Sequence, residues 1–279
     1  LHTALSAHFL IVAGLCLWIY RDFMRRAKYI RLWTVLICCG TLINAYFTPM
    51  LFGILLCACM QELIQGGKIK ELASPILIPA AVTLISCTLF GMFYGDTNAS
   101  GSGGLDILSF NLNALVNPFT WTTKFGHGAS EHDFSGVSYS RLLPDLPLMS
   151  PYQNEGFSYL GFGMLLLCIF ALICAKILTA HIKNKRQAIS YVIAVFVYLA
   201  VFTYLALSPA ITIGKKQLLY IHYPTVIWNA LSTFRSTARF IWPVYYMLMS
   251  LALILPIKAL NLSVATDTFC KRCLHDDIN

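Results

Sequence analysis

Two arginines near the end of the chain have the type and spacing needed to bind an anion. Arg235 and Arg239 lie four residues apart in the motif Phe234–Trp242. On a helical turn they would share one face and present two guanidinium forks to a phosphate or carboxylate group. Interfacial arginines that reach the phosphates of ordinary lipids have the same spacing, so both interpretations stay open.

Residues 142–161 carry carboxylates whose backbone is held by prolines and a glycine. Two prolines flank Asp145, a glycine follows Glu155, and Tyr159 belongs to the same motif. A carboxylate fixed at a bilayer surface is costly unless it is paired or used. We therefore expect these acids to form one wall of a cleft that has a phosphate-binding arginine on its other wall, with helix capping or pairing to an arginine as the alternative for Glu155.

A third cluster has side chains that bind metal ions in other proteins. Its spacing matches no metal motif, and its glycine-rich surroundings are typical of a solvated loop. The sequence therefore predicts no metal site, and the cluster supplies only weak candidates: His127, Glu131, His132 and Asp133.

The composition requires that these motifs be positioned by membrane helices. Hydrophobic residues make up 58% of the 279 residues and charged residues 11%, far from the balance of soluble proteins. A spanning helix needs about 20 apolar residues. Five runs qualify: His2–Tyr20, Leu72–Phe93, Phe157–Ile177, Ala188–Leu207 and Phe240–Ile257. A sixth stretch, Leu32–Gln61, has basic segments on both sides and is predicted to be a short hairpin that turns at Asn44–Pro49.

The sequence thus predicts an all-α integral membrane protein with about seven transmembrane helices, two of them the short hairpin, and one long and one shorter external loop. The divisions are residues 1–95 (helices, with the hairpin at 32–61), 96–155 (external loop), 156–257 (helices, with external loop 208–239) and 258–279 (cytoplasmic tail). The segments assigned inside carry fourteen basic and six acidic residues and so supply the whole net charge of +8, as the positive-inside rule expects. No nucleic-acid partner is implied.

The two external loops carry opposite charges. The long loop has six acidic and two basic residues, a net of four negative charges. The shorter loop has four basic residues and no acidic one. We expect the loops to attract each other across a shared external surface, either as simple pairs or as the two walls of a cleft.

Three motifs carry a resemblance: Leu142–Pro147, Tyr152–Gly163 and Phe234–Pro243. With His2–His8 and Asn44–Phe47, they resemble the C-terminal half of a bacterial family of multi-pass membrane proteins that is similar to the GT-C glycosyltransferases. The resemblance implies a polyprenyl-phosphate sugar donor, a cell-envelope acceptor and transfer on the external face of the bacterial inner membrane. It implies that Arg235 and Arg239 bind the donor phosphate, and that Asp145 and Glu155 orient a hydroxyl acceptor or shape the loop.

In GT-C enzymes the catalytic acid, and much of any divalent-cation site, lies in a first external loop that would precede Leu1. The chain is therefore expected to be the C-terminal part of a longer protein and inactive alone. Two other classes stay open. One is a carrier or flippase for a lipid-linked or anionic substrate, and the other is a membrane assembly subunit whose external loop binds a partner.

Overall fold

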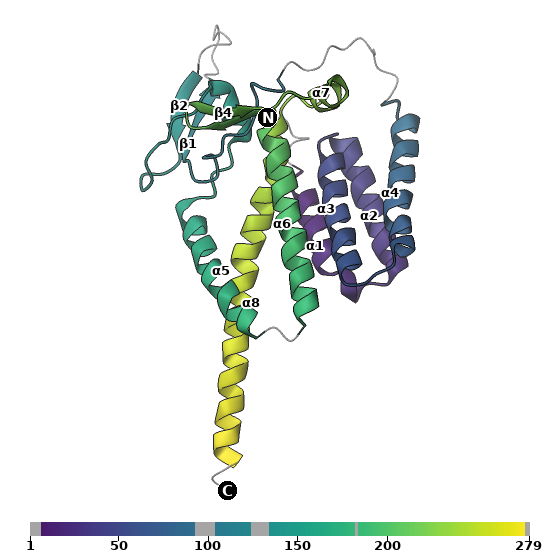
Figure 1. Ribbon diagram of the computed structural model, residues 1–279, viewed down its shortest axis with the longest axis vertical. Helices are drawn as coiled ribbons and strands as arrows, with labels where there is room; N and C mark the ends of the chain where they lie inside the picture. The colour runs from purple at the N-terminus through teal and green to yellow at the C-terminus, as the bar shows by residue number, and fades with distance from the viewer. Residues whose placement is uncertain (1–6, 93–103, 124–133, 182–183, 277–279) are drawn as a thin grey trace.

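A computed structural model describes residues 7–92, 104–123, 134–181 and 184–276 (Figure 1). The described part is mostly helical, with short 3-10 turns η2 (Arg21–Phe23), η3 (Pro151–Gly156) and η4 (Thr237–Phe240). Its α-helices are α1 (Phe9–Ile19), α2 (Arg26–Ile43), α3 (Phe47–Ile64), α4 (Ile69–Leu89), α5 (Phe162–Ala180), α6 (Lys185–Leu207), α7 (Thr225–Ser232) and α8 (Ile241–Asp276). The stretch expected to be a tail from residue 258 is thus a continuation of α8 as far as Asp276.

Among the described residues, five helical segments are long and apolar enough to cross a membrane. They are Phe47–Ile64, Ile69–Leu89, Phe162–Ala180, Lys185–Leu207 and Thr237–Leu262. Only 11% of the most apolar part of α5 is buried inside the protein, so most of this helix presents apolar side chains outward. A surface of that kind is stable in lipid but not in water. The chain is therefore a multi-pass membrane protein.

The expectation of an all-α fold is corrected by two short antiparallel hairpins. Strand β1 (Phe119–Thr123) pairs with β2 (Phe134–Ser138), and β3 (Ala210–Ile213) pairs with β4 (Lys216–Tyr220). The β1 sequence Phe-Thr-Trp-Thr-Thr is rich in aromatic and β-branched residues, which favour strands. Hairpins this short need support from neighbours, and a bridge from Asn111 to Thr212 ties the long loop to the second hairpin.

Helices α2 and α3 form the hairpin expected at Leu32–Gln61, but the turn is shorter than predicted. It covers only Asn44–Tyr46, and the Asn44 side chain accepts a hydrogen bond of 3.0 Å from the Tyr46 backbone N–H. Pro49 lies in the first turn of α3, where a backbone N–H has no helical partner to lose. Each helix has 18 residues, because α2 also extends through the basic segment from Arg26.

The helices form two groups that are joined by α6 (Figure 1). Helices α1 to α4 lie together, α5 packs along α8, and α6 contacts both α3 and α8. The buried core follows this seam, with Ile54 of α3, Phe202 of α6 and Ile241 of α8 all at most 2% exposed. The two strand hairpins, β1–β2 and β3–β4, lie at one end of the helices, and the C-terminus lies at the other (Figure 1). The fold thus collects its irregular segments at a single end.

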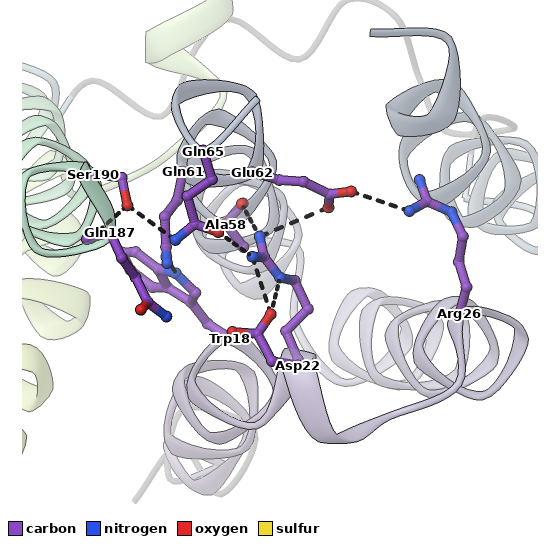
Figure 2. A network of polar contacts seen from close by, with 10 residues as sticks. Trp18, Asp22, Arg26, Ala58, Gln61, Glu62, Gln65, Gln187 and Ser190 are labelled. Carbon is purple, nitrogen blue, oxygen red and sulfur yellow. Dashed lines mark hydrogen bonds and ion pairs between the residues drawn. The ribbon is translucent and has the colours of Figure 1, made fainter. Parts of the chain in front are cut away.

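A network of polar side chains joins α1, η2, α2, α3 and α6 at the end opposite to the strand hairpins (Figure 2). Arg21 donates to the Ala58 carbonyl at 3.0 Å and to the Gln65 side chain at 3.0 Å. Gln65 in turn donates to Ser190 of α6 at 2.9 Å. Arg21 thereby binds a carbonyl in the last two turns of α3 and connects η2, α3 and α6.

Within this network, the Trp18 indole donates to the Gln61 side-chain oxygen at 2.6 Å, and both residues are at most 4% exposed. We expect Gln61→Leu to lower the free energy of unfolding by about 1–2 kcal/mol, because a buried N–H would lose its acceptor. The double variant Trp18→Phe, Gln61→Leu should be more stable than the sum of its single changes predicts. Chemical unfolding of the wild-type protein, the two single variants and the double variant in the same detergent measures the four free energies. Strictly additive losses would contradict the coupling.

Candidate functional site

The segment between α7 and α8 is held tightly at the hairpin end of the molecule. The Ser236 backbone N–H donates to the Tyr46 hydroxyl at 2.7 Å, and the Ser236 hydroxyl donates to the Leu108 carbonyl at 3.1 Å. The Thr237 hydroxyl donates to the Ser208 carbonyl at 2.8 Å. Ser236 and Thr237 are fully buried. The segment is therefore fixed by the α2–α3 turn, by the long loop and by the end of α6.

Glu155 binds both arginines of this segment. The Arg239 Nε donates to Glu155 Oε2 at 2.8 Å, and the Arg239 Nη2 contacts the same oxygen. The Arg235 Nη2 lies 3.8 Å from Glu155 Oε1. The Arg239 and Glu155 side chains are 10% and 19% exposed, whereas the Arg235 side chain is 63% exposed. We call Glu155, Arg235 and Arg239 the arginine triad; it has a net charge of +1.

An aromatic wall backs the arginine triad. The Arg239 guanidinium carbon lies 4.9 Å from the ring centre of Tyr46, within cation–π range. The Tyr46 ring in turn contacts the rings of Phe234 and Phe240. Burial raises the pKa of Tyr46, so this residue stays a neutral phenol whose ring and hydroxyl support the segment.

The structure brings the arginines together differently from the helical spacing that the sequence suggested. Arg239 lies in η4, but Arg235 lies before it in a bend, so the two do not share a helix face. They converge because both reach Glu155. The pairing of Glu155 with an arginine, one of the two alternatives, is the one that the structure contains. The opposite charges of the two loops also meet here.

The other predicted candidates lie outside the triad. Asp145 is exposed and accepts a hydrogen bond of 2.5 Å from the Ser138 hydroxyl. The Tyr159 hydroxyl is buried without a hydrogen-bond partner in the described part of the chain. No group of three possible metal ligands occurs among the described residues. The four weak metal candidates, His127, Glu131, His132 and Asp133, lie outside those residues.

Two further residues, Tyr46 beside the triad and His8 beside α8, were not identified from the sequence as site residues. Tyr46 belongs to the α2–α3 turn. In the sequence, only its position within the predicted turn and the motif Asn44–Phe47 distinguished it from other aromatic residues. His8 lies beside α8, with its ring 4.2 Å from the Trp242 ring and its Nδ1 3.0 Å from the Tyr246 hydroxyl. Tyr46 is far from Arg239 in sequence, so spacing could not reveal their contact.

The geometry defines what the triad can do. Glu155 is occupied by Arg239, so it is poorly placed to accept a proton from a substrate. Arg235 keeps an exposed guanidinium that lies 3.8 Å from the Glu155 carboxylate. Such a group recognises an anion by charge and by paired hydrogen bonds.

A family model described as a domain of unknown function, DUF6311, matches residues 1–270. No curated protein and no solved structure matches the chain.

Proposed function

The chain belongs to the DUF6311 family, and we propose that it binds the phosphate of a lipid-linked sugar donor as part of a GT-C-like membrane glycosyltransferase. The observation that carries this proposal is the exposed Arg235 guanidinium, which lies beside the part-buried ion pair of Glu155 and Arg239. Glu155 lies near both arginines but neutralises only one of them, so one positive charge is left uncompensated. A phosphate ester neutralises that charge and accepts two parallel hydrogen bonds from one guanidinium.

The position of the triad along the helices suits a lipid headgroup. Arg239 lies within the apolar segment Thr237–Leu262, close to its first residue. We propose that the short helix α1 and the helix α2, whose first turns are basic, also cross the membrane, which gives seven crossings. Short helices are tolerated where they pack against protein, as α1 does against α2 and α3. The triad then lies at the headgroup level of one leaflet.

We further propose that this leaflet is the external one of the bacterial inner membrane. The connection between α1 and α2 carries Arg21 and Arg25, and Lys68 precedes α4. Both connections lie at the end opposite to the hairpins (Figure 1). The positive-inside rule assigns that end to the cytoplasm, together with the end of α8. The hairpins and the triad are then external.

The proposal predicts that Arg235→Ala lowers kcat/KM for sugar transfer about 10- to 100-fold, because one charge-assisted contact to the donor phosphate is lost. Labelled sugar transferred from a polyprenyl-phosphate donor by membranes containing the full-length protein measures this effect. Arg235→Lys should restore part of the rate, since it keeps the charge but not the fork. The melting temperature should not change, because the Arg235 side chain is 63% exposed.

The matched control is Arg141→Ala, which removes an exposed arginine of the long loop. It should leave transfer unchanged. Equal transfer by the wild-type protein and by Arg235→Ala would refute the assignment of the phosphate site. Movement of the lipid-linked sugar across proteoliposomes, without transfer to any acceptor, would instead indicate the carrier alternative.

A further inference from the structure

A cavity lies between the long loop and the second strand hairpin, against η3, the turn that also carries Glu155 of the triad. It has a volume of about 340 Å³, near the lower limit of small-molecule sites. Three segments line it: the start of the described long loop, the approach to η3, and the strands β3 and β4. We call it the hairpin pocket. The lining residues that matter below are Asp106, Ser109, Tyr152, Gln153, Gln217 and Tyr220.

Ser109 gives the hairpin pocket an unsatisfied polar group. The residue is 1% exposed, and its hydroxyl has no hydrogen-bond partner in the part of the chain that the structure describes. A buried hydroxyl without a partner destabilises a folded protein. Such groups occur where a ligand supplies the missing partner. The Ser109 hydroxyl therefore points to a ligand that can donate or accept a hydrogen bond.

The Gln153 side chain, which also lines the pocket, is held in place by three hydrogen bonds. The Gln153 side-chain oxygen accepts from Asn111 Nδ2 at 2.9 Å and from the Met149 backbone N–H at 3.2 Å. The Gln153 side-chain nitrogen donates to the Thr212 hydroxyl at 2.8 Å. These three bonds fix the amide and connect η3 to the second hairpin. A pocket whose polar wall is already ordered loses little conformational entropy when it binds a ligand.

The charge of the lining limits the kind of ligand. Asp106 is the one charged residue among those that line the described cavity. A phosphate or carboxylate would be repelled by it, and an apolar ligand would leave the Ser109 hydroxyl unpaired. A metal ion would require more carboxylate or imidazole groups than the pocket offers. A ligand with several hydroxyl groups meets all of these conditions, because each hydroxyl both donates and accepts.

Two tyrosines complete the set of contacts. Tyr152 and Tyr220 both line the pocket and offer ring faces to the C–H groups of a ligand. Burial and the nearby Asp106 carboxylate raise the pKa of Tyr220, so its hydroxyl stays a hydrogen-bond donor. Gln217 of β4 adds an exposed amide. Carboxylate, amide and hydroxyl groups beside aromatic rings together suit the face and the rim of a sugar ring.

We propose that the hairpin pocket binds a neutral sugar residue. Sugar binding stands on the pocket alone, whereas the role of that sugar as the acceptor rests on the proposed function. The two sites share walls: Ser109 is followed by Phe110, which packs on Gly156, and Gly156 follows Glu155 of the triad. The turn η3 thus lines the hairpin pocket with Tyr152 and Gln153 and also carries the carboxylate that binds Arg239.

The test uses methyl glycosides of glucose, galactose, mannose and N-acetylglucosamine with the purified full-length protein in nanodiscs. Saturation-transfer NMR should detect binding of at least one of them. Ser109→Ala should weaken that binding about 10-fold and leave the melting temperature equal or higher, because the orphan hydroxyl is gone. If Ser109 only supported the fold, Ser109→Ala would lower the melting temperature instead. Asp106→Asn should also weaken binding without unfolding the protein.

Arg235→Ala and Asp145→Asn are the controls, and both should keep wild-type affinity for the glycoside. If no glycoside bound at concentrations up to about 10 mM, which corresponds to a binding free energy weaker than about −3 kcal/mol, the proposal would be overturned. Equal affinity in the wild-type protein and Ser109→Ala would overturn it as well. Intact glycoside binding with transfer that is insensitive to Arg235→Ala would reject the proposed function and leave the sugar site standing.

Discussion

Glu155→Ala should lower the free energy of unfolding by about 3–5 kcal/mol, the largest effect expected for any single change in the triad. The Arg239 side chain is 10% exposed, and Glu155 is its carboxylate partner. Without Glu155, the protein would bury an uncompensated guanidinium charge beside the Tyr46 ring. Chemical unfolding in one detergent, followed by the near-ultraviolet signal of the aromatic residues, measures the loss.

A mutant cycle separates the charge effect from packing. Arg239→Met should also destabilise, because Glu155 would lose its buried partner, but the double variant Glu155→Leu, Arg239→Met should recover much of the stability. Asp145→Ala is the matched control, since it removes an exposed carboxylate of the same loop and should change stability little. Equal losses in Asp145→Ala and Glu155→Ala would show that the buried pair is not what stabilises this end of the protein.

Gly104→Ala should lower the free energy of unfolding by about 1–3 kcal/mol through overpacking. A Cβ atom at this position would lie 2.2 Å from the Arg235 carbonyl oxygen and 2.6 Å from Leu108 Cδ1. The backbone oxygen cannot turn aside as a flexible side chain can. The segment that carries Arg235 must therefore move, and binding of a polyprenyl-phosphate lipid should weaken together with the melting temperature.

Gly163→Ala provides the control for Gly104→Ala. Nothing lies within 4 Å of a Cβ atom at Gly163, which is the second residue of α5. The same substitution there should be neutral or should stabilise by up to about 1 kcal/mol, because alanine loses less backbone entropy on folding. If Gly104→Ala behaved like Gly163→Ala, the close packing of the long loop on Arg235 would not matter to stability or to phosphate binding.

The positions of the apolar helices follow from composition and length. The predicted runs Phe157–Ile177 and Ala188–Leu207 overlap α5 (Phe162–Ala180) and α6 (Lys185–Leu207). A segment of about 20 apolar residues has few stable alternatives to a helix in a bilayer, since lipid offers no hydrogen bonds to its backbone. The two strand hairpins escaped prediction because strands of four or five residues carry little periodic signal.

The candidate site was predicted in its residue types but not in its geometry. The sequence identified Arg235, Arg239 and Glu155, and the opposite charges of the two loops indicated that they would meet. It also grouped Asp145 with them, although the structure places Asp145 against Ser138. Charge alone attracts every acid of one loop to every base of the other. Only packing selects which carboxylate becomes buried with an arginine.

The sequence by itself determined that this chain is a membrane protein and roughly where its helices run. Those properties are local, because they depend on the free energy of placing each segment in lipid. The tertiary structure decided the rest: Glu155 and Arg239 lie 84 positions apart, Tyr46 comes from a third segment, and Ser109 is left without a partner. Such contacts depend on how several helices and loops pack together, so no spacing within one segment can encode them.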